Sequence, residues 1–247
     1  MLPTIALVVG CALIGTSVGV SGIGGFLIVP AMLLLTDSTP AEAVLTALLA
    51  NVAATLATGT VAVVRRHVLW RVFGWLSLGG SAAALGSAWL VSNLSPQITR
   101  VIVALFLVAI GMVVLFGRQR PRVGRRAVKT LETVGIGALA QLSAVLAGIG
   151  GPAVTVPALT AQGQNQVMAI GTGLLHGVVI SIVGIVVLLG ASGAVQPTVE
   201  LVLFPAIVVA FAFLANLLRS RFTSQPLIRR IVGLSSVAGG VFTLLTV

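Results

Sequence analysis

Long apolar runs without any Asp, Glu, Lys or Arg are the feature that most constrains this chain. Three of them cover 101–117, 173–194 and 201–218. Each is close to the roughly 20 residues that a helix needs to cross a hydrocarbon core of about 30 Å. Hydrophobic residues make up 58% of the 247 residues and charged residues only 7%, whereas about 25% of an ordinary soluble domain is charged. We therefore expect an all-α polytopic membrane protein, because spanning helices satisfy their own backbone groups.

The basic residues lie in the joints between the apolar runs. The formal net charge of +10 comes from 14 basic and 4 acidic residues. The joints 65–71, 118–129 and 219–230 are rich in Arg and Lys, whereas 91–100 holds one Arg and 191–200 holds none. The positive-inside rule places the three basic joints in the cytoplasm. Membrane topology therefore explains the charge, and we expect no nucleic-acid partner.

One short glycine motif occurs twice, each time inside an apolar run. The first copy reads Ser21-Gly22-Ile23-Gly24-Gly25 and the second reads Ala147-Gly148-Ile149-Gly150-Gly151. A proline follows each copy, at Pro30 and Pro157. Repeated breaks at matching positions of two hydrophobic halves indicate a transport site that is built from discontinuous helices.

The similarity between the halves extends beyond the glycines. Thr46-Ala47-Leu48-Leu49 matches Thr172-Gly173-Leu174-Leu175 at the offset of 126 residues that also separates Gly22 from Gly148. We expect a first repeat over 1–117, a basic cytoplasmic linker over 118–129 and a second repeat over 130–247, all in one membrane domain. The predicted full spans are 42–64, 72–91, 99–117, 166–190, 199–218 and 228–246.

The charge pattern predicts that the two repeats have opposite orientations. Between the basic joint 118–129 and the neutral joint 191–200 the chain must cross the membrane an odd number of times. The simplest solution makes 130–161 a re-entrant hairpin with its tip at the second glycine motif, and 2–35 a similar hairpin from the other side. Each half then holds one hairpin and three spans, which makes the repeats inverted. The alternative has eight plain crossings in parallel halves, and it would place the arginines of 219–230 outside.

With these motifs in place, the chain resembles the sulfite exporter TauE/SafE family, also called the toluene-sulfonate uptake permease group. The resemblance rests on the two Gly-x-Gly-Gly motifs with their prolines, on Val68-Leu69-Trp70-Arg71 and on the Arg-rich middle of the chain. It covers essentially the whole chain. It implies a carrier of the bacterial inner (plasma) membrane for sulfite, sulfoacetate, other organosulfonates or related small anions. Pro152 stands where the first motif has Phe26, so the two half-helices need not start alike.

The distribution of acidic residues also favours an anion as the substrate. The only carboxylates are Asp37, Glu42, Glu132 and Glu200, and all lie near the ends of apolar runs. A cation carrier normally needs a carboxylate within a span. An anion site needs only exposed backbone N–H groups and the positive end of a half-helix. We therefore expect a secondary transporter of a small, sulfur-containing oxyanion, which works by alternating access with its site between the two breaks.

The candidate substrate-binding residues are the motif glycines and the polar residues near them. They are Ser21, Gly22, Gly24, Gly25, Thr46, Asn51, Gly148, Gly150, Gly151, Thr172 and His176. Asn51 and His176 lie about ten residues into matching spans, where polar groups are costly in lipid, and we interpret both as donors to the anion. For Thr46 and Thr172 the alternative is a hydrogen bond to their own helix, and for Ser21 it is helix capping. The position of Gln141, before the second break, allows a ligand role.

Other small residues are expected to pack helices together instead of binding a substrate. Close helix contact is the common use of small residues in membrane proteins. This prediction applies to Gly79, Gly80, Ala83 and Gly86.

Two other functions remain compatible with the sequence. One is an anion channel with the same site, which the absence of saturable counterflow would reveal, and the other is a non-transporting membrane scaffold or assembly factor. The sequence has no nucleotide-binding Gly-Lys-Ser/Thr loop, no His-Glu metal motif and no nucleophile elbow. We therefore expect no enzyme activity, no metal and no cofactor. The expected partners are the anion, membrane lipid and a coupling proton or counter-ion, and a homo-oligomer remains open.

Overall fold

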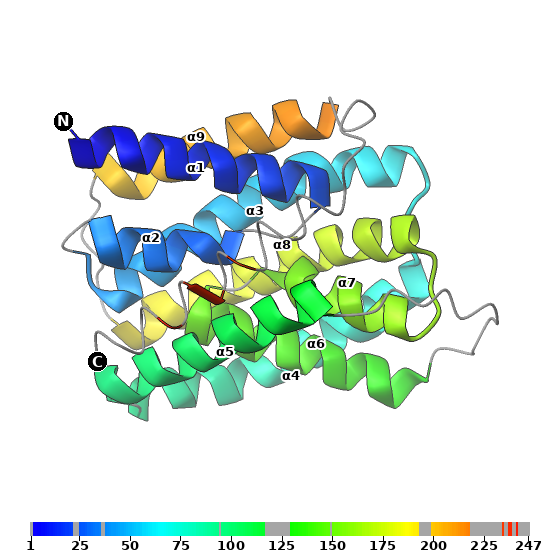
Figure 1. The fold of residues 1–247 in the computed structure, drawn as a ribbon. Coiled ribbons are helices and arrows are strands. Elements are labelled where there is room, and N and C mark those ends of the chain that lie inside the picture. Colours follow the sequence, from blue (N-terminus) through cyan, green and yellow to red (C-terminus); the bar gives the residue numbers. More distant parts are fainter. Residues whose placement is uncertain are drawn as a thin grey trace.

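The chain forms a bundle of helices (Figure 1). The computed structural model describes residues 2–21, 25–35, 38–93, 95–116, 129–148, 150–192 and 199–217, together with positions 234, 237, 238 and 241. The elements are α1 (Leu2–Ser21), the 3-10 turn η1 (Gly25–Leu27), α2 (Ile28–Leu35), α3 (Pro40–Val64), α4 (Trp70–Asn93), α5 (Pro96–Phe116), α6 (Thr130–Ala147), α7 (Gly151–Ala161), α8 (Gln166–Ser192) and α9 (Val199–Leu217). All regular structure in the described residues is helical, which confirms the all-α class. The predicted span 228–246 lies almost wholly outside these residues.

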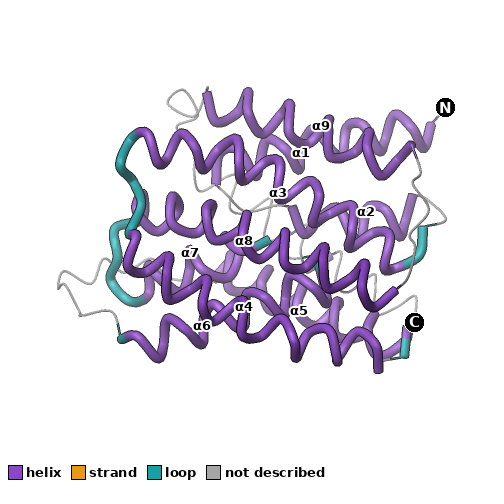
Figure 2. The backbone as a smooth tube through the Cα atoms, turned by 180° about the vertical axis from the view of Figure 1, so that it is seen from behind, coloured by secondary structure: helices purple, strands orange, loops and turns teal. Residues whose placement is uncertain are grey.

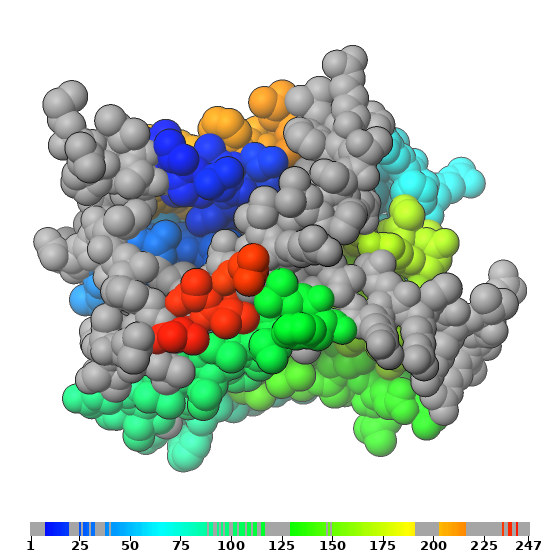
Figure 3. Space-filling model, in the orientation of Figure 1, coloured from blue at the N-terminus to red at the C-terminus, as the bar shows by residue number. Residues whose placement is uncertain are grey.

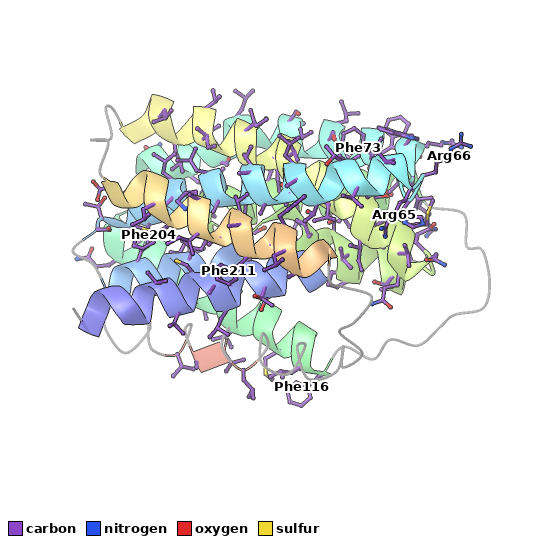
Figure 4. The ribbon with its side chains drawn as sticks, turned by 90° about the horizontal axis from the view of Figure 1, so that it is seen from above. Arg65, Arg66, Phe73, Phe116, Phe204 and Phe211 are labelled. Atoms are coloured by element: carbon purple, nitrogen blue, oxygen red, sulfur yellow. The ribbon has the colours of Figure 1, made fainter. Side chains whose placement is uncertain are left out.

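The long helix α3 has clear start and stop signals in the sequence. Thr39 and Glu42 form a capping box, in which the Thr39 side chain accepts from the Glu42 N–H at 3.3 Å and Glu42 Oε2 accepts from the Thr39 N–H at 2.7 Å. Pro40 occupies the first helical position, where its missing N–H costs nothing. The helix ends at Val64, and the next two residues, Arg65 and Arg66, point away from the bundle (Figure 4). The 25 residues between these signals are long enough to cross a membrane.

Helices α3 and α8 form the centre of the bundle and run antiparallel (Figure 2). A Cβ built on Gly59 would meet Leu175, one on Gly177 would meet Thr55, and one on Gly184 would meet Leu48. The residue numbers on α3 fall as those on α8 rise, which sets the antiparallel direction. These two helices contain the segments Ala41–Val64 and Gln166–Gly190, which are long and apolar enough to span a membrane.

The remaining helices pack crosswise between the halves. Helix α4 of the first half packs on α6 and α8 of the second, and α9 of the second half packs on α1 and α3 of the first. These two sets of contacts correspond when α1, α3 and α4 are matched with α6, α8 and α9. Together with the antiparallel central pair, they are the contacts that an inverted repeat predicts.

Glycines allow close approach at both crosswise interfaces. On the α4–α6 side, Gly79 lies against the Val134 carbonyl and Gly137 lies against the Leu76 carbonyl. On the α1–α9 side, Gly15 and Gly19 lie against carbonyls of α9. Packing by Gly79 and Gly80 is therefore confirmed. At Gly86 the prediction is wrong, because a Cβ built there meets no described atom within 4 Å.

The second broken segment is a hairpin that returns to the end of the bundle where it began. Gln162, just after α7, donates from Nε2 to Glu132 Oε2 in the first turn of α6 at 3.4 Å. At the same end, the Leu69 N–H donates to Thr172 Oγ1 at 2.9 Å. The basic stretch 65–71 and Lys129 therefore share one end of the molecule, as the topology prediction requires. The other basic residues of the joints, within 118–128 and 219–230, lie outside the described residues.

The N-terminus lies at the opposite end of the bundle (Figures 1 and 2). Helices α1 and α2 contact each other and bring the chain back to that end before α3 begins. The space-filling view shows α1 and α9 at one edge of the molecule and α4 and α6 at the other (Figure 3). The two crosswise pairs thus flank the central helices.

Large apolar side chains cover the outside of the bundle. Leu85 is 83% exposed, Leu131 84% and Phe116 70%, and Phe116 projects away from the helices (Figure 4). Exposed apolar area on this scale is a liability in water but is the expected surface against lipid. The buried positions, by contrast, include Asn51, Gln141 and His176. The bundle therefore buries these three polar side chains and presents apolar ones on its outside, as a membrane protein does.

Candidate functional site

The second glycine motif reverses the chain inside the bundle. Helix α6 ends with Gly148 in the left-handed region at φ 62°, a conformation that favours glycine. The Gly148 N–H bonds back to the Ala144 carbonyl at 2.9 Å. Gly150 is the N-cap of α7, and no side chain caps this helix. Pro152 lies in the first turn of α7, where proline is tolerated.

The first motif interrupts the chain at a matching place. Helix α1 ends at Ser21, and η1 begins at the buried Gly25 before α2 continues. Of the predicted site residues, Gly22 and Gly24 lie outside the described residues, as does the side chain of Ser21. Gly25 is therefore the residue of this motif that can be placed against its neighbours.

Asn51 of α3 lies where the two breaks meet. Its Nδ2 donates to the Gly148 carbonyl at 3.2 Å. A Cβ built on Gly150 would lie 2.9 Å from Asn51 Oδ1, and one built on Gly25 would overlap the same oxygen. Asn51 is only 3% exposed. One buried carboxamide thus contacts both interruptions, and it fits only because side chains are absent at Gly25 and Gly150.

The second half repeats this contact without the side chain. The offset of 126 residues maps Gly25 onto Gly151 and Asn51 onto Gly177. A Cβ built on Gly151 would lie 2.8 Å from the Gly177 Cα. The segment after each break therefore begins in close contact with the central helix of its own half. Only the first half has a side-chain carboxamide, that of Asn51, at this contact.

Among the other predicted site residues, the two threonines bond to backbone groups. Thr46 Oγ1 donates to the Glu42 carbonyl of its own helix at 2.8 Å. Thr172 Oγ1 donates to the Met168 carbonyl at 2.7 Å and accepts from the Leu69 N–H. Both side chains are fully buried. Both have the structural hydrogen bonds of the alternative interpretation, and Thr172 also fixes the loop before α4.

His176 faces α4 and not the glycine motifs. Its Nε2 lies 3.1 Å from the Leu76 carbonyl. A carbonyl only accepts, so Nε2 carries the hydrogen and Nδ1 is an acceptor in the neutral ring. A Cβ built on Gly80 would lie 3.4 Å from the same Nε2. The structure thus brings Gly25, Asn51, Gly148, Gly150 and Gly151 together, and it directs His176 to a neighbouring interface.

Two further polar side chains are buried near the second break. Neither Gln141 Nε2 nor Gln141 Oε1 has a hydrogen-bond partner among the described residues, and the same holds for Ser181 Oγ. Both side chains are fully buried. The repeat offset would have identified Ser181 as the counterpart of Thr55, a residue that lies beside Gly177. For Gln141 the sequence signal was its place two turns before Gly148.

The described residues at the breaks supply partial charges, and no Asp, Glu, Lys or Arg is buried among them. The buried polar residues of the described chain are Thr, Ser, Asn, Gln and His. The N-terminus of α7 adds about half a positive charge, together with N–H groups of its first turn. No group of three or more His, Cys, Asp or Glu residues suited to a metal ion occurs among the residues that the structure describes. Such a site is suited to a small anion that accepts hydrogen bonds.

The chain is similar to known transport proteins. The family model described as sulfite exporter TauE/SafE matches residues 7–243. A relative from Haemophilus influenzae (strain ATCC 51907 / DSM 11121 / KW20 / Rd), named "Probable membrane transporter protein", is 29% identical over 188 residues. The alignment covers 73% of this chain and 71% of the relative. No solved structure matches the chain.

Proposed function

Because the chain belongs to the sulfite exporter TauE/SafE family and is an integral membrane transporter, we propose that it is a secondary carrier of a small oxyanion. The anion binds between the two glycine breaks, and the inverted halves rock about it to alternate access. The substrate class is sulfite, an organosulfonate or a related sulfur-containing anion. The membrane is the bacterial inner membrane.

The observation that carries this proposal is the meeting of both breaks at Asn51. The amide of Asn51 and the N-terminus of α7 converge on one buried point. Oxyanions accept several hydrogen bonds, and a helix N-terminus is a ready-made anion site. The described interior offers no buried carboxylate that would repel a negative charge or attract a cation.

In this conformation Asn51 also forms a hydrogen bond that connects the two halves. Its Nδ2–H reaches from α3 in the first repeat to the Gly148 carbonyl in the second. An anion that takes this donor releases Gly148, and the two hairpins are then free to separate. Binding and the change of access are thereby linked through one hydrogen bond.

The direction of transport depends on the energy source. An uncoupled anion is driven outward when the inside is negative, by about 2.3 kcal/mol per charge for each 100 mV. Proton coupling or exchange would change this balance. The proposal therefore requires a measurement of saturable flux and not only of net movement.

The test is counterflow of radiolabelled sulfite in proteoliposomes. We expect saturable counterflow by the wild-type protein and a loss of about tenfold or more in Gly150→Ala, because the added methyl displaces Asn51 from the site. The matched control is Gly135→Ala on α6, where a Cβ meets no described atom within 4 Å. Flux without counterflow would indicate a channel. The complete absence of anion flux would favour a scaffold.

A further inference from the structure

Among the described side chains, the buried carboxamide of Gln141 is the one that lacks a partner at both of its polar atoms. Both its donor nitrogen and its acceptor oxygen lack a partner among the described residues, although the side chain is fully buried. Buried polar groups are nearly always hydrogen-bonded, and each unpaired one costs about 1–3 kcal/mol. A side-chain amide whose nitrogen and oxygen both lack a partner therefore points to a ligand that supplies both a donor and an acceptor.

The neighbours of Gln141 place it where α4, α6 and α8 meet. One turn before it, Gly137 lies against the Leu76 carbonyl of α4. One turn after it, Val145 lies 3.5 Å from the Cβ position of Gly184 on α8. Residues one turn apart share a helix face. Gln141 thus lies on the face of α6 that turns from α4 towards α8.

This interface adjoins the second break through Ile180. The side chain of Ile180 lies 3.0 Å from the Cβ position of Gly80 on α4 and 3.1 Å from that of Gly151 at the start of α7. His176 precedes Ile180 by one turn, and Ser181 follows it directly. The unpartnered groups of Gln141, His176 and Ser181 therefore lie on α6 and α8, two helices in contact, at the level where Ile180 reaches the second break.

The hydrogen-bonding character of these groups is mixed. Gln141 Oε1 accepts, and His176 Nδ1 also accepts because Nε2 carries the hydrogen towards the Leu76 carbonyl. Gln141 Nε2 donates, and Ser181 Oγ does either. A fully deprotonated anion has no hydrogen for the acceptors and would leave them unpaired.

We propose that Gln141, together with His176 Nδ1 and Ser181, extends the site at the breaks and selects an oxyanion that still carries an O–H group over one that carries none. This inference rests on the proposed anion transport and narrows its substrate class. The preferred species is a monoprotonated anion such as hydrogen sulfite. Its O–H donates to the acceptor side of the site, and its other oxygens accept from the amide of Gln141 and the N-terminus of α7.

The experiment measures the ligand-induced shift in melting temperature of the purified protein at slightly acidic pH. The probes are hydrogen sulfite and methanesulfonate, which carry the same charge but differ in the O–H group. The wild-type protein is expected to bind hydrogen sulfite about tenfold more tightly, which corresponds to one hydrogen bond. In Gln141→Met this preference disappears, while the ligand-free protein melts at the same or a higher temperature because an unpaired amide has been removed.

Two further variants keep the test decisive. Ser143→Ala is the matched control on the same helix, because its hydroxyl already donates to the Ala140 carbonyl at 2.9 Å, and it should retain the preference. Gln141→Asn withdraws the carboxamide by one methylene and should give an intermediate preference even if Gln141→Met does not fold. Equal binding of both anions by the wild-type protein, or an unchanged preference in the Gln141 variants, overturns the inference and leaves anion transport standing. If neither anion binds, both proposals fail.

Discussion

The two glycine breaks approach equivalent positions of the central helices, but they meet different atoms there. In the first half the start of the second arm, Gly25, presses on Asn51, whereas in the second half Gly151 presses on Gly177. In both halves a glycine lies close to the central helix, but the central-helix residue at the contact differs. The proposed anion site is therefore asymmetric: the first half supplies a side-chain donor, and the second supplies the N-terminus of α7.

The largest effect in this comparison is expected at Gly151. Its Cβ would lie 2.8 Å from the Gly177 Cα, so the clash is with backbone and no side chain can move aside. We expect Gly151→Ala to lower the free energy of unfolding by about 3 kcal/mol or more, at or above the top of the range typical of overpacking. The measurement is the melting temperature of the purified protein, with Gly135→Ala as the control. Equal melting of the two variants would contradict the close contact.

A smaller effect is expected at Gly25, because the atom in the way belongs to a side chain. The Gly25→Ala variant should lose about 1–3 kcal/mol, and truncation of Asn51 should relieve much of that loss. A double-mutant cycle of Gly25→Ala and Asn51→Ala is expected to give a coupling energy of about 0.5–3 kcal/mol. Strict additivity would show that Asn51 does not fill the space beside Gly25.

Asn51→Ala by itself makes the two halves more alike. It removes the donor to Gly148 and leaves a buried carbonyl unpaired, which costs about 1–3 kcal/mol. Sulfite counterflow should fall about tenfold or more, because the anion loses its side-chain donor. A variant with a lowered melting temperature but normal sulfite counterflow would show that Asn51 has only a structural role.

The smallest stability changes are expected at the two equivalent threonines, Thr46 and Thr172, and they differ between the two. In Thr172→Val the Leu69 N–H loses its acceptor, and we expect a loss of about 1 kcal/mol. In Thr46→Val only a bond to the same helix is lost, and we expect a smaller change. Chemical denaturation of both variants, with counterflow measured alongside, tests this order. A loss of flux in either variant at unchanged stability would restore the threonine to the anion site.

The architecture could be predicted from the sequence because its signals are local and repeated. Charge-free runs define the helices, the Gly-x-Gly-Gly motifs define the breaks, and the basic joints define which ends lie together. The second hairpin appears as expected, with arms of 18 and 11 residues. These features depend on composition and spacing, and they need no knowledge of how helices face one another.

The sequence could not show which neighbouring helix each side chain contacts. Asn51 and His176 lie at similar depths in matching spans, but the offset of 126 maps Asn51 onto Gly177 and Ala50 onto His176. One residue turns a helix face by about 100°, so Asn51 meets the breaks and His176 meets α4. Gly86 shows the same limit, since a small residue does not reveal whether its face is covered. The unpaired state of Gln141 likewise depends on how three helices pack.

If both breaks converge on Asn51 to hold one anion, selenite, a heavier analogue of sulfite, should bind there. An anomalous difference map from crystals grown with selenite should show a peak within hydrogen-bond distance of Asn51 Nδ2 and the first turn of α7. A peak elsewhere in the bundle, with Asn51 still bonded to Gly148, would contradict it.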